Sequence, residues 1–138
     1  MSLALIFPGQ GSQVVGMGRA LAASDARADA AFATADEVLG FSLSGLMRDG
    51  PEHELTATQN AQPAILAHSV AVLRTIEDQM GPVAYAAGHS LGEFSAHVAA
   101  GTFRFEDALA VVRLRGELMF RAGQERPGTM AAILGLSD

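Results

Sequence analysis

The stretch Gly88-His89-Ser90-Leu91-Gly92 constrains the fold of this chain more than any other. A short apolar run over residues 82–87 precedes it, and an amphipathic run over residues 94–100 follows it. This order predicts a strand, a sharp turn and a helix. Glycines two positions before and after Ser90 give the Gly-x-Ser-x-Gly pattern of a nucleophile elbow. We therefore expect an α/β fold, with a parallel central sheet flanked by helices on both faces.

The spacing of the two glycines has a chemical reason. A serine at so tight a turn has a strained backbone, and side chains two positions away would collide with the opposite arm, so glycine is needed there. The turn lifts the Ser90 hydroxyl out of the sheet, and the amino end of the next helix offers N–H groups to a developing oxyanion. The Leu91 amide is the natural first donor. The same residues also fit a glycine-rich turn in which Ser90 only caps the helix.

The composition excludes several classes of function. The chain has 138 residues, enough for one domain with a core, and no cysteine, which excludes disulfides, thiolate catalysis and thiolate metal sites. This fits a reducing compartment, and we expect a cytoplasmic protein. The net charge of −6, without a cluster of Lys and Arg, argues against nucleic acid or a membrane surface as partner. No apolar run is long enough to cross a bilayer.

The amino-terminal residues predict a strand followed by a loop. Residues 3–7 form an apolar run typical of a central strand covered on both faces, rather than a secretory signal. The loop over residues 8–13 fails as a phosphate-binding loop, because Val14 stands where a third glycine is needed and no Gly-Lys-Ser/Thr follows. A loop at the carboxyl end of a strand is a usual place for an active site. A structural loop and a site loop are both open.

Helical patterns fill most of the remaining chain. They predict helices over residues 15–23, 25–39, 42–48, 63–79, 94–100 and 105–121, and a last strand over 129–136. We expect Ser24 to cap the second helix, Gly40 to end it, and residues 51–60 to form a surface connection. His97 follows Ser90 by about two helical turns, roughly 10 Å along the axis, which is too far for a general base.

Five short motifs stand in order along the chain: Phe7-Pro8-Gly9-Gln10-Gly11-Ser12-Gln13, Gln62-Pro63-Ala64, Gly88-His89-Ser90-Leu91-Gly92-Glu93, Arg115-Gly116 and Met130-Ala131-Ala132. In order and spacing they resemble the amino-terminal part of the malonyl-CoA:acyl carrier protein transacylases, the malonyl loaders of bacterial fatty acid synthesis. The resemblance implies an α/β-hydrolase-like acyltransferase core over residues 1–128. Residues 129–138 would then begin the smaller ferredoxin-like subdomain, with the carboxyl-terminal part absent.

The resemblance also implies a ping-pong acyl transfer without a bound cofactor or metal. Ser90 would attack the thioester of malonyl-CoA, hold the malonyl group as an ester, and pass it to the phosphopantetheine thiol of acyl carrier protein. The amides of Gln10 and Leu91 would form the oxyanion hole. Arg115 would hold the free malonyl carboxylate through a two-pronged contact. Two further residues, Gln62 and His89, would bind substrate, and we expect a monomer.

The family is longer than this chain, and its catalytic histidine lies beyond the last residue given. None of the histidines present can be carried over as the base: His53, His68, His89 and His97. Loss of a catalytic base typically lowers the rate by several orders of magnitude. We therefore expect these residues to belong to a longer enzyme and to transfer little or nothing alone.

Two other functions share parts of this sequence pattern. A serine hydrolase or thioesterase of α/β type would have the same elbow, but it requires an acid and a histidine after the serine. A non-catalytic fragment could bind acyl carrier protein or coenzyme A without forming an ester. Malonyl and methylmalonyl groups both carry the carboxylate that Arg115 would bind, and both fatty acid and polyketide pathways fit.

Overall fold

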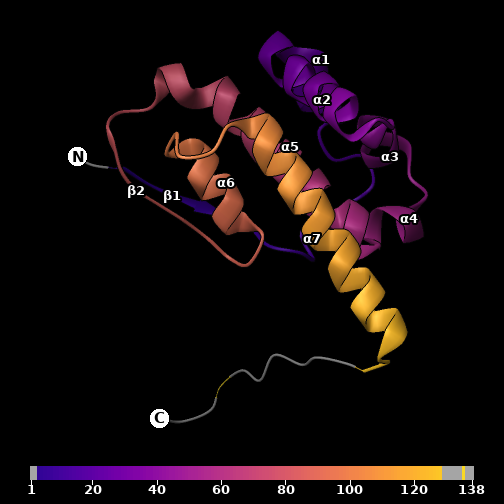
Figure 1. The fold of residues 1–138 in the computed structure, drawn as a ribbon. Coiled ribbons are helices and arrows are strands. Elements are labelled where there is room, and N and C mark those ends of the chain that lie inside the picture. The colour runs from indigo at the N-terminus through magenta and orange to yellow at the C-terminus, as the bar shows by residue number, and fades with distance from the viewer. Residues whose placement is uncertain (1–2, 129–134, 136–138) are drawn as a thin grey trace.

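The computed structural model describes residues 3–128 and 135. The elements follow the order β1 (Leu3–Phe7), α1 (Arg19–Ser24), α2 (Ala26–Leu39), α3 (Leu43–Asp49), α4 (Glu52–Thr56), α5 (Thr58–Ile76), η1 (Glu77–Gln79), β2 (Val83–Gly88), α6 (Gly92–Ala99) and α7 (Phe105–Glu125). Figure 1 shows the two strands side by side with α6 beside them, and α7 running across α5. The strand expected over 129–136 and the subdomain expected over 129–138 lie outside the described residues, Gly135 apart.

The two strands pair in parallel, and both end beside the predicted turn. Phe7, at the end of β1, is the register partner of Gly88, at the end of β2. One face of the sheet is covered and includes Phe7, which is 8% exposed. The opposite face carries Ile6 and Tyr85, each 76% exposed. The expectation of a strand covered on both faces, with helices on both, is therefore wrong for the described residues. An apolar run predicts that a strand can be buried, but it does not identify the segments that cover its two faces.

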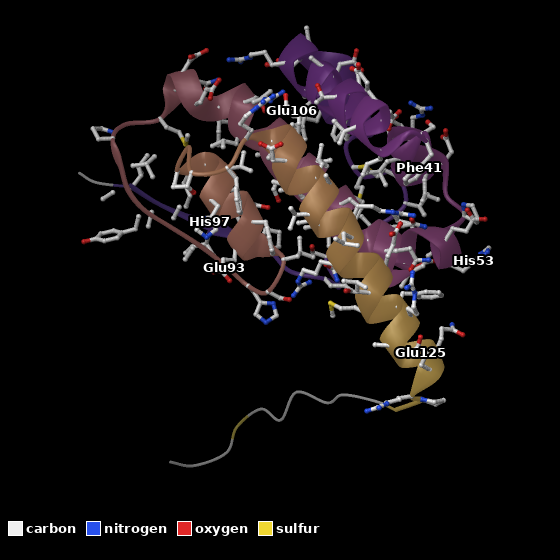
Figure 2. All side chains as sticks on the ribbon, viewed as in Figure 1. Phe41, His53, Glu93, His97, Glu106 and Glu125 are labelled. Atoms are coloured by element: carbon white, nitrogen blue, oxygen red, sulfur yellow. The ribbon has the colours of Figure 1, made fainter. Side chains whose placement is uncertain are left out.

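The core lies among the helices rather than against the sheet. Helix α5 is buried over most of its circumference because apolar side chains occupy nearly every position from Ala61 to Ala71. It packs against α2 and α7, and Figure 2 marks the length of α7 by Glu106 near its start and Glu125 at its end. The largest fully buried apolar side chains of this core are those of Leu43, Met47, Leu55, Leu66, Val70, Leu109 and Val112. The sheet edge that carries Ser90 is thus held by a packed helical layer.

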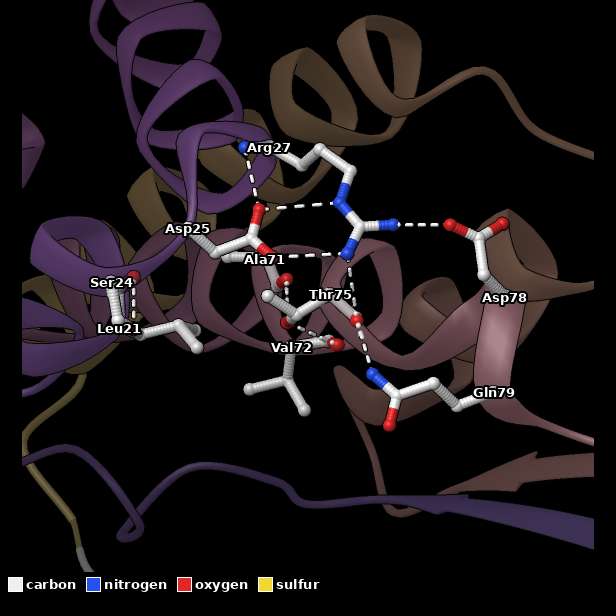
Figure 3. Close-up of polar contacts among 9 residues, drawn as sticks. All are labelled: Leu21, Ser24, Asp25, Arg27, Ala71, Val72, Thr75, Asp78 and Gln79. Carbon is white, nitrogen blue, oxygen red and sulfur yellow. Dashed lines mark hydrogen bonds and ion pairs between the residues drawn. The ribbon is translucent and has the colours of Figure 1, made fainter.

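Polar contacts fix the start of α2 to the end of α5 (Figure 3). The Asp25 carboxylate caps α2 by accepting from the Arg27 amide at 2.8 Å, so the expectation of Ser24 as cap is wrong. The Ser24 hydroxyl instead donates to the Leu21 carbonyl. Hydrogen bonds from the Arg27 guanidinium hold the pKa of the Asp25 carboxyl below its usual value. The same guanidinium donates to the Thr75 carbonyl at 3.0 Å, which joins the two helices.

Several helix boundaries differ from the sequence prediction: the first helix begins at Arg19 rather than at residue 15, and α7 continues to Glu125. Residues 51–60 are not a plain connection, since they contain α4 and the first three residues of α5. Pro63 is the sixth residue of α5 rather than part of its first turn. Contacts with α7 stabilise the turn of α5 that precedes Pro63, and the local sequence does not predict such contacts. Gly40 ends α2 as predicted, in the left-handed conformation.

Among the described residues, no helix is long and apolar enough to cross a membrane.

Candidate active site

The turn between β2 and α6 has the geometry of a nucleophile elbow. Ser90 has φ of 54°, the only positive φ of a non-glycine residue among those described. Such a conformation costs on the order of 1–3 kcal/mol and persists only where the surroundings enforce it. The His89 amide donates to the Phe7 carbonyl at 3.1 Å, which ties the turn to the end of β1. The exposed Ser90 side chain therefore stands at the carboxyl edge of the sheet, as predicted.

The two flanking glycines are required by close backbone packing. A Cβ atom on Gly88 would lie 1.9 Å from the carbonyl carbon of Gly92. A Cβ atom on Gly92 would lie 2.5 Å from the Phe7 carbonyl oxygen. No side chain fits either position, so the Gly-x-Ser-x-Gly spacing follows from the shape of this turn. The alternative of a turn in which Ser90 caps the helix is not borne out, because α6 has no side-chain cap.

Two backbone amides near Ser90 are available to a ligand. Within the described residues, neither the Gln10 amide nor the Leu91 amide donates a hydrogen bond to another group. The Leu91 side chain is fully buried, which fixes the position of its amide at the start of α6. A free N–H group at the amino end of a helix, as in Leu91, favours a negatively charged oxygen. The two amides are the pair that the family resemblance implies for an oxyanion hole.

Arg115 reaches Ser90 from α7. Its Nη2 donates to Ser90 Oγ at 3.0 Å, and its Nη1 donates to Gln62 Oε1 at 2.6 Å. Gln62 on α5 is completely buried, so its carboxamide is a fixed partner for the guanidinium. The structure thus brings together Ser90, Gln62 and Arg115, residues from three separate elements that were singled out in the sequence.

Two residues of the site were not found from the sequence. Met119 Sδ accepts from Gln62 Nε2 at 3.3 Å, which gives the buried carboxamide a second partner. The Thr58 hydroxyl accepts from Gln10 Nε2 at 3.1 Å. Both lie four residues from a predicted site residue on the same helix, Met119 after Arg115 and Thr58 before Gln62. An i, i+4 search from those residues would have found them, because such positions share one helix face.

None of the four histidines hydrogen-bonds to Ser90 in the described part of the chain. His97 Nδ1 lies 2.8 Å from Thr102 Oγ1, and its Nε2 lies 3.9 Å from Glu93 Oε1. Figure 2 shows His97 and Glu93 together, with His53 well apart near α4. His68 lies on α5, where burial lowers its pKa below the ordinary value.

His89 is exposed and packs against the 8–13 loop rather than against Arg115. A Cβ atom on Gly9 would lie 2.5 Å from His89 Nδ1, so only glycine allows the loop to approach this ring. The contact places the loop next to the elbow. The 8–13 loop therefore lies beside the elbow, where a site loop is expected, and its part in the reaction stays a prediction.

Comparison with known proteins identifies the family to which this chain belongs. A family model described as an acyl transferase domain matches residues 4–136. A malonyl CoA-acyl carrier protein transacylase of Bacillus subtilis (strain 168) is 49% identical over 134 residues, which are 97% of this chain and 42% of that protein. The protein of the same name from Escherichia coli (strain K12) is 48% identical, and the match covers 98% of this chain and 44% of that protein. The chain thus spans less than half the length of these relatives.

Solved structures agree in fold as well as in sequence. An acyl carrier protein S-malonyltransferase from Vibrio cholerae has a TM-score of 0.85 and 48% identity, over 88% of this chain and 40% of that one. A structure of a type II PKS acyl-carrier protein in complex with its malonyl-transacylase gives a TM-score of 0.83 and 46% identity, over 88% and 40%. These matches confirm the α/β fold and the resemblance drawn from the five motifs. Because the family model covers nearly all of its residues, the chain belongs to the acyl transferase domain family.

Proposed function

We propose that this chain carries the nucleophile and the carboxylate-binding arginine of a malonyl-CoA:acyl carrier protein transacylase of fatty acid biosynthesis. One observation supports this above all: Arg115 Nη2 lies 3.0 Å from Ser90 Oγ while Gln62 holds Nη1. A simple esterase has no need of a fixed cation at its nucleophile. A malonyl transferase does, because its acyl group carries a carboxylate.

The dimensions of the malonyl group fit this arrangement. Its thioester carbon and its carboxylate carbon are joined through one methylene, so they lie only about 2.5 Å apart for two bonds of about 1.5 Å. A cation that binds the carboxylate must therefore lie within a few ångströms of the attacking oxygen. Arg115 satisfies that condition, and its planar guanidinium can offer two parallel N–H donors to a carboxylate.

The reaction would proceed in two balanced steps. Ser90 Oγ attacks the thioester carbonyl, the oxyanion is held by the Gln10 and Leu91 amides, and the C–S bond breaks to release coenzyme A. The Ser90 proton passes through a general base to the leaving thiolate. The phosphopantetheine thiol of acyl carrier protein then attacks the seryl ester, the ester C–O bond breaks, and the proton of that thiol passes through the base to Ser90 Oγ. Coenzyme A thioester is a substrate here, and the steps call for no bound cofactor.

The general base would come from the part of the longer enzyme that lies outside the region matched by this chain. His97 pairs with Thr102, and no histidine among the described residues contacts Ser90. The relatives are more than twice as long as the part matched here. We therefore expect the 138-residue chain alone to form the malonyl ester very slowly, and the active protein to be a longer cytoplasmic chain.

Acyl carrier protein is the proposed second substrate. One structural neighbour is a malonyl-transacylase in complex with a type II PKS acyl-carrier protein, which supports a carrier protein as the acceptor. An exposed arginine on the helix that carries Arg115 suits an acidic carrier. Arg121 is on the same helix as Arg115 and is exposed.

Intact mass spectrometry tests this proposal. Residues 1–128 are fused to the remaining part of the Bacillus subtilis relative, and the fusion and the isolated chain are each incubated with malonyl-CoA. The fusion should gain one malonyl group that the Ser90→Ala variant does not gain, and that transfers to added acyl carrier protein. The isolated chain should gain little or none. An adduct that persists in Ser90→Ala would overturn the assignment of the nucleophile.

The same samples separate the two alternatives. A serine hydrolase would release the acyl group to water, would accept simple acyl esters, and would be unaffected by Arg115→Ala. A non-catalytic fragment would bind acyl carrier protein equally well with Ser90→Ala and form no adduct in either protein. Neither pattern is expected.

A further inference from the structure

The 8–13 loop holds a proposed oxyanion donor but has few contacts that fix it. Gln10 stands between Gly9 and Gly11, and Gly11 has a φ of 106°. Two of the loop's side-chain hydrogen bonds are internal, from Ser12 Oγ to the Gly9 carbonyl and from the Gly11 amide to Gln13 Oε1. Gly9 packs against His89, but nothing lies within 4 Å of a Cβ atom on Gly11, so the backbone after Gln10 can rotate unless something outside the loop restrains it.

One side-chain hydrogen bond leaves the loop within the described part of the chain. Gln10 Nε2 donates to Thr58 Oγ1 at 3.1 Å, across 48 positions of sequence. The bond fixes the far end of the Gln10 side chain. Among residues 3–128, it is the one polar contact between the loop and the helical layer.

Thr58 itself stands on a rigid support. It is the first residue of α5, and a Cβ atom on Gly116 of α7 would lie 2.9 Å from its carbonyl oxygen. One residue later, the Gln59 carbonyl accepts from Arg113 Nη1 at 2.9 Å. These contacts press the start of α5 against α7 directly beside Arg115. Thr58 therefore joins the loop to the same helix pair that holds the carboxylate-binding arginine.

We propose that Thr58 is a positioning residue, whose hydroxyl holds the Gln10 side chain so that the Gln10 main-chain amide faces the oxygen that develops negative charge at Ser90. The effect of Thr58 on catalysis rests on the proposed function. Its effect on the position of Gln10 does not. The hydroxyl does not touch the reacting atoms. It acts by restricting where the donor lies, and an oxyanion donor is useful only when it is fixed before the reaction.

The structural consequence is tested in the 138-residue chain by amide hydrogen exchange. Thr58→Val keeps the branched shape but removes the acceptor, whereas Thr58→Ser keeps the hydroxyl. Thr58→Val should raise the exchange rates of the Gln10 side-chain amide and of the Gln10 and Gly11 backbone amides about two- to tenfold, the range expected for one lost hydrogen bond. Thr58→Ser should match the unaltered chain. Thr34→Val, which removes a hydroxyl bonded to the Ala30 carbonyl within α2, is the matched control.

The catalytic consequence is tested in the fusion with the Bacillus subtilis relative. Thr58→Val should lower the rate of malonyl ester formation about two- to tenfold at saturating malonyl-CoA, with KM nearly unchanged, because substrate binding through Arg115 is intact. Gln10→Met removes the same bond from the other end. The double variant should be no slower than the slower single variant.

Three results would overturn the inference. Unchanged exchange rates at Gln10 in Thr58→Val would show that the hydrogen bond to Thr58 does not hold Gln10 in place. Equal effects of Thr58→Ser and Thr58→Val would show that the shape of the Thr58 side chain matters, and not its hydroxyl. Additive losses in the double variant would show that the two residues act independently.

If Thr58→Val fails to fold by circular dichroism, Gln10→Met gives the exchange test without altering α5. If no fusion forms the malonyl ester, the proposed function fails while the exchange result stands.

Discussion

Arg113 on α7 completes a hydrogen bond that Pro63 on α5 cannot make. Pro63 has no amide hydrogen, so the carbonyl of Gln59, four residues earlier in the helix, has no helical donor. Arg113 Nη1 donates to that carbonyl at 2.9 Å and also reaches Asn60 Oδ1 at 2.7 Å. The turn of α5 that holds Gln62 is therefore fixed by the helix that holds Arg115.

Removal of this contact should destabilise the fold. Arg113→Met would leave the Gln59 carbonyl without its donor and lose the bond to Glu117, so the free energy of unfolding should fall by about 1.5–3 kcal/mol. Urea denaturation followed by circular dichroism measures the change. Arg121→Met, an exposed position on the same helix, should shift the free energy by less than about 0.5 kcal/mol. Equal losses in both variants would contradict this role for Arg113.

Gly88 should not tolerate any side chain. A Cβ atom there would overlap the Gly92 carbonyl carbon at 1.9 Å, and backbone on both sides cannot move without opening the elbow. Gly88→Ala should therefore lower the free energy of unfolding by about 3 kcal/mol or more, at the upper end of overpacking effects. Gly81→Ala is the control, because nothing lies within 4 Å of its added methyl group. The account would be wrong if Gly88→Ala unfolded at the same urea concentration as Gly81→Ala.

The backbone at Ser90 should be strained in the free protein. Ser90 has φ of 54°, which glycine adopts without steric cost and alanine does not. Ser90→Gly should therefore be more stable than Ser90→Ala by about 1 kcal/mol, although both variants lack the nucleophile. Thermal unfolding of the two variants side by side measures the difference. A Ser90→Ala protein as stable as Ser90→Gly would show that the turn is relaxed.

Acidification should destabilise the protein through His68. Burial lowers the pKa of His68 below its ordinary value of 6.5, so the unfolded chain binds the proton more readily than the folded one. Stability should therefore fall as the pH drops from 7.5 through 6.5 toward the lower pKa of the folded state. His68→Gln should reduce the loss of stability between pH 7.5 and pH 5.5 in urea titrations. His53→Gln, at an exposed position, should leave the loss unchanged.

The sequence predicts the elbow well because its constraints are local. Glycine, serine and glycine at fixed spacing between an apolar run and an amphipathic run specify the turn, and the structure places Ser90 where that pattern predicts it. The Arg115–Gln62 contact joins residues 53 positions apart, so only the family resemblance indicated that they share a pocket. No rule of spacing within one helix could do so.

The predictions that failed depended on tertiary contacts or on competition between neighbours. Asp25 caps α2 in place of Ser24 because its carboxylate also receives the Arg27 guanidinium, which a hydroxyl cannot match. Helix α5 begins before Pro63 because Arg113 supplies the missing donor. The open sheet face at Ile6 and Tyr85 shows that apolar sequence alone does not identify the segment that covers a strand.

The choice between malonyl and acetyl groups is the sharpest test of whether Arg115 binds the malonyl carboxylate. The fusion is incubated with equal concentrations of malonyl-CoA and acetyl-CoA, and mass spectrometry of the peptide containing Ser90 gives the ratio of the two esters. The malonyl ester should dominate, and Arg115→Ala should lower the ratio of malonyl to acetyl ester about tenfold or more, because a charged hydrogen bond to the carboxylate is lost. A ratio that is unchanged in Arg115→Ala, with Ser90 still acylated, would contradict the account.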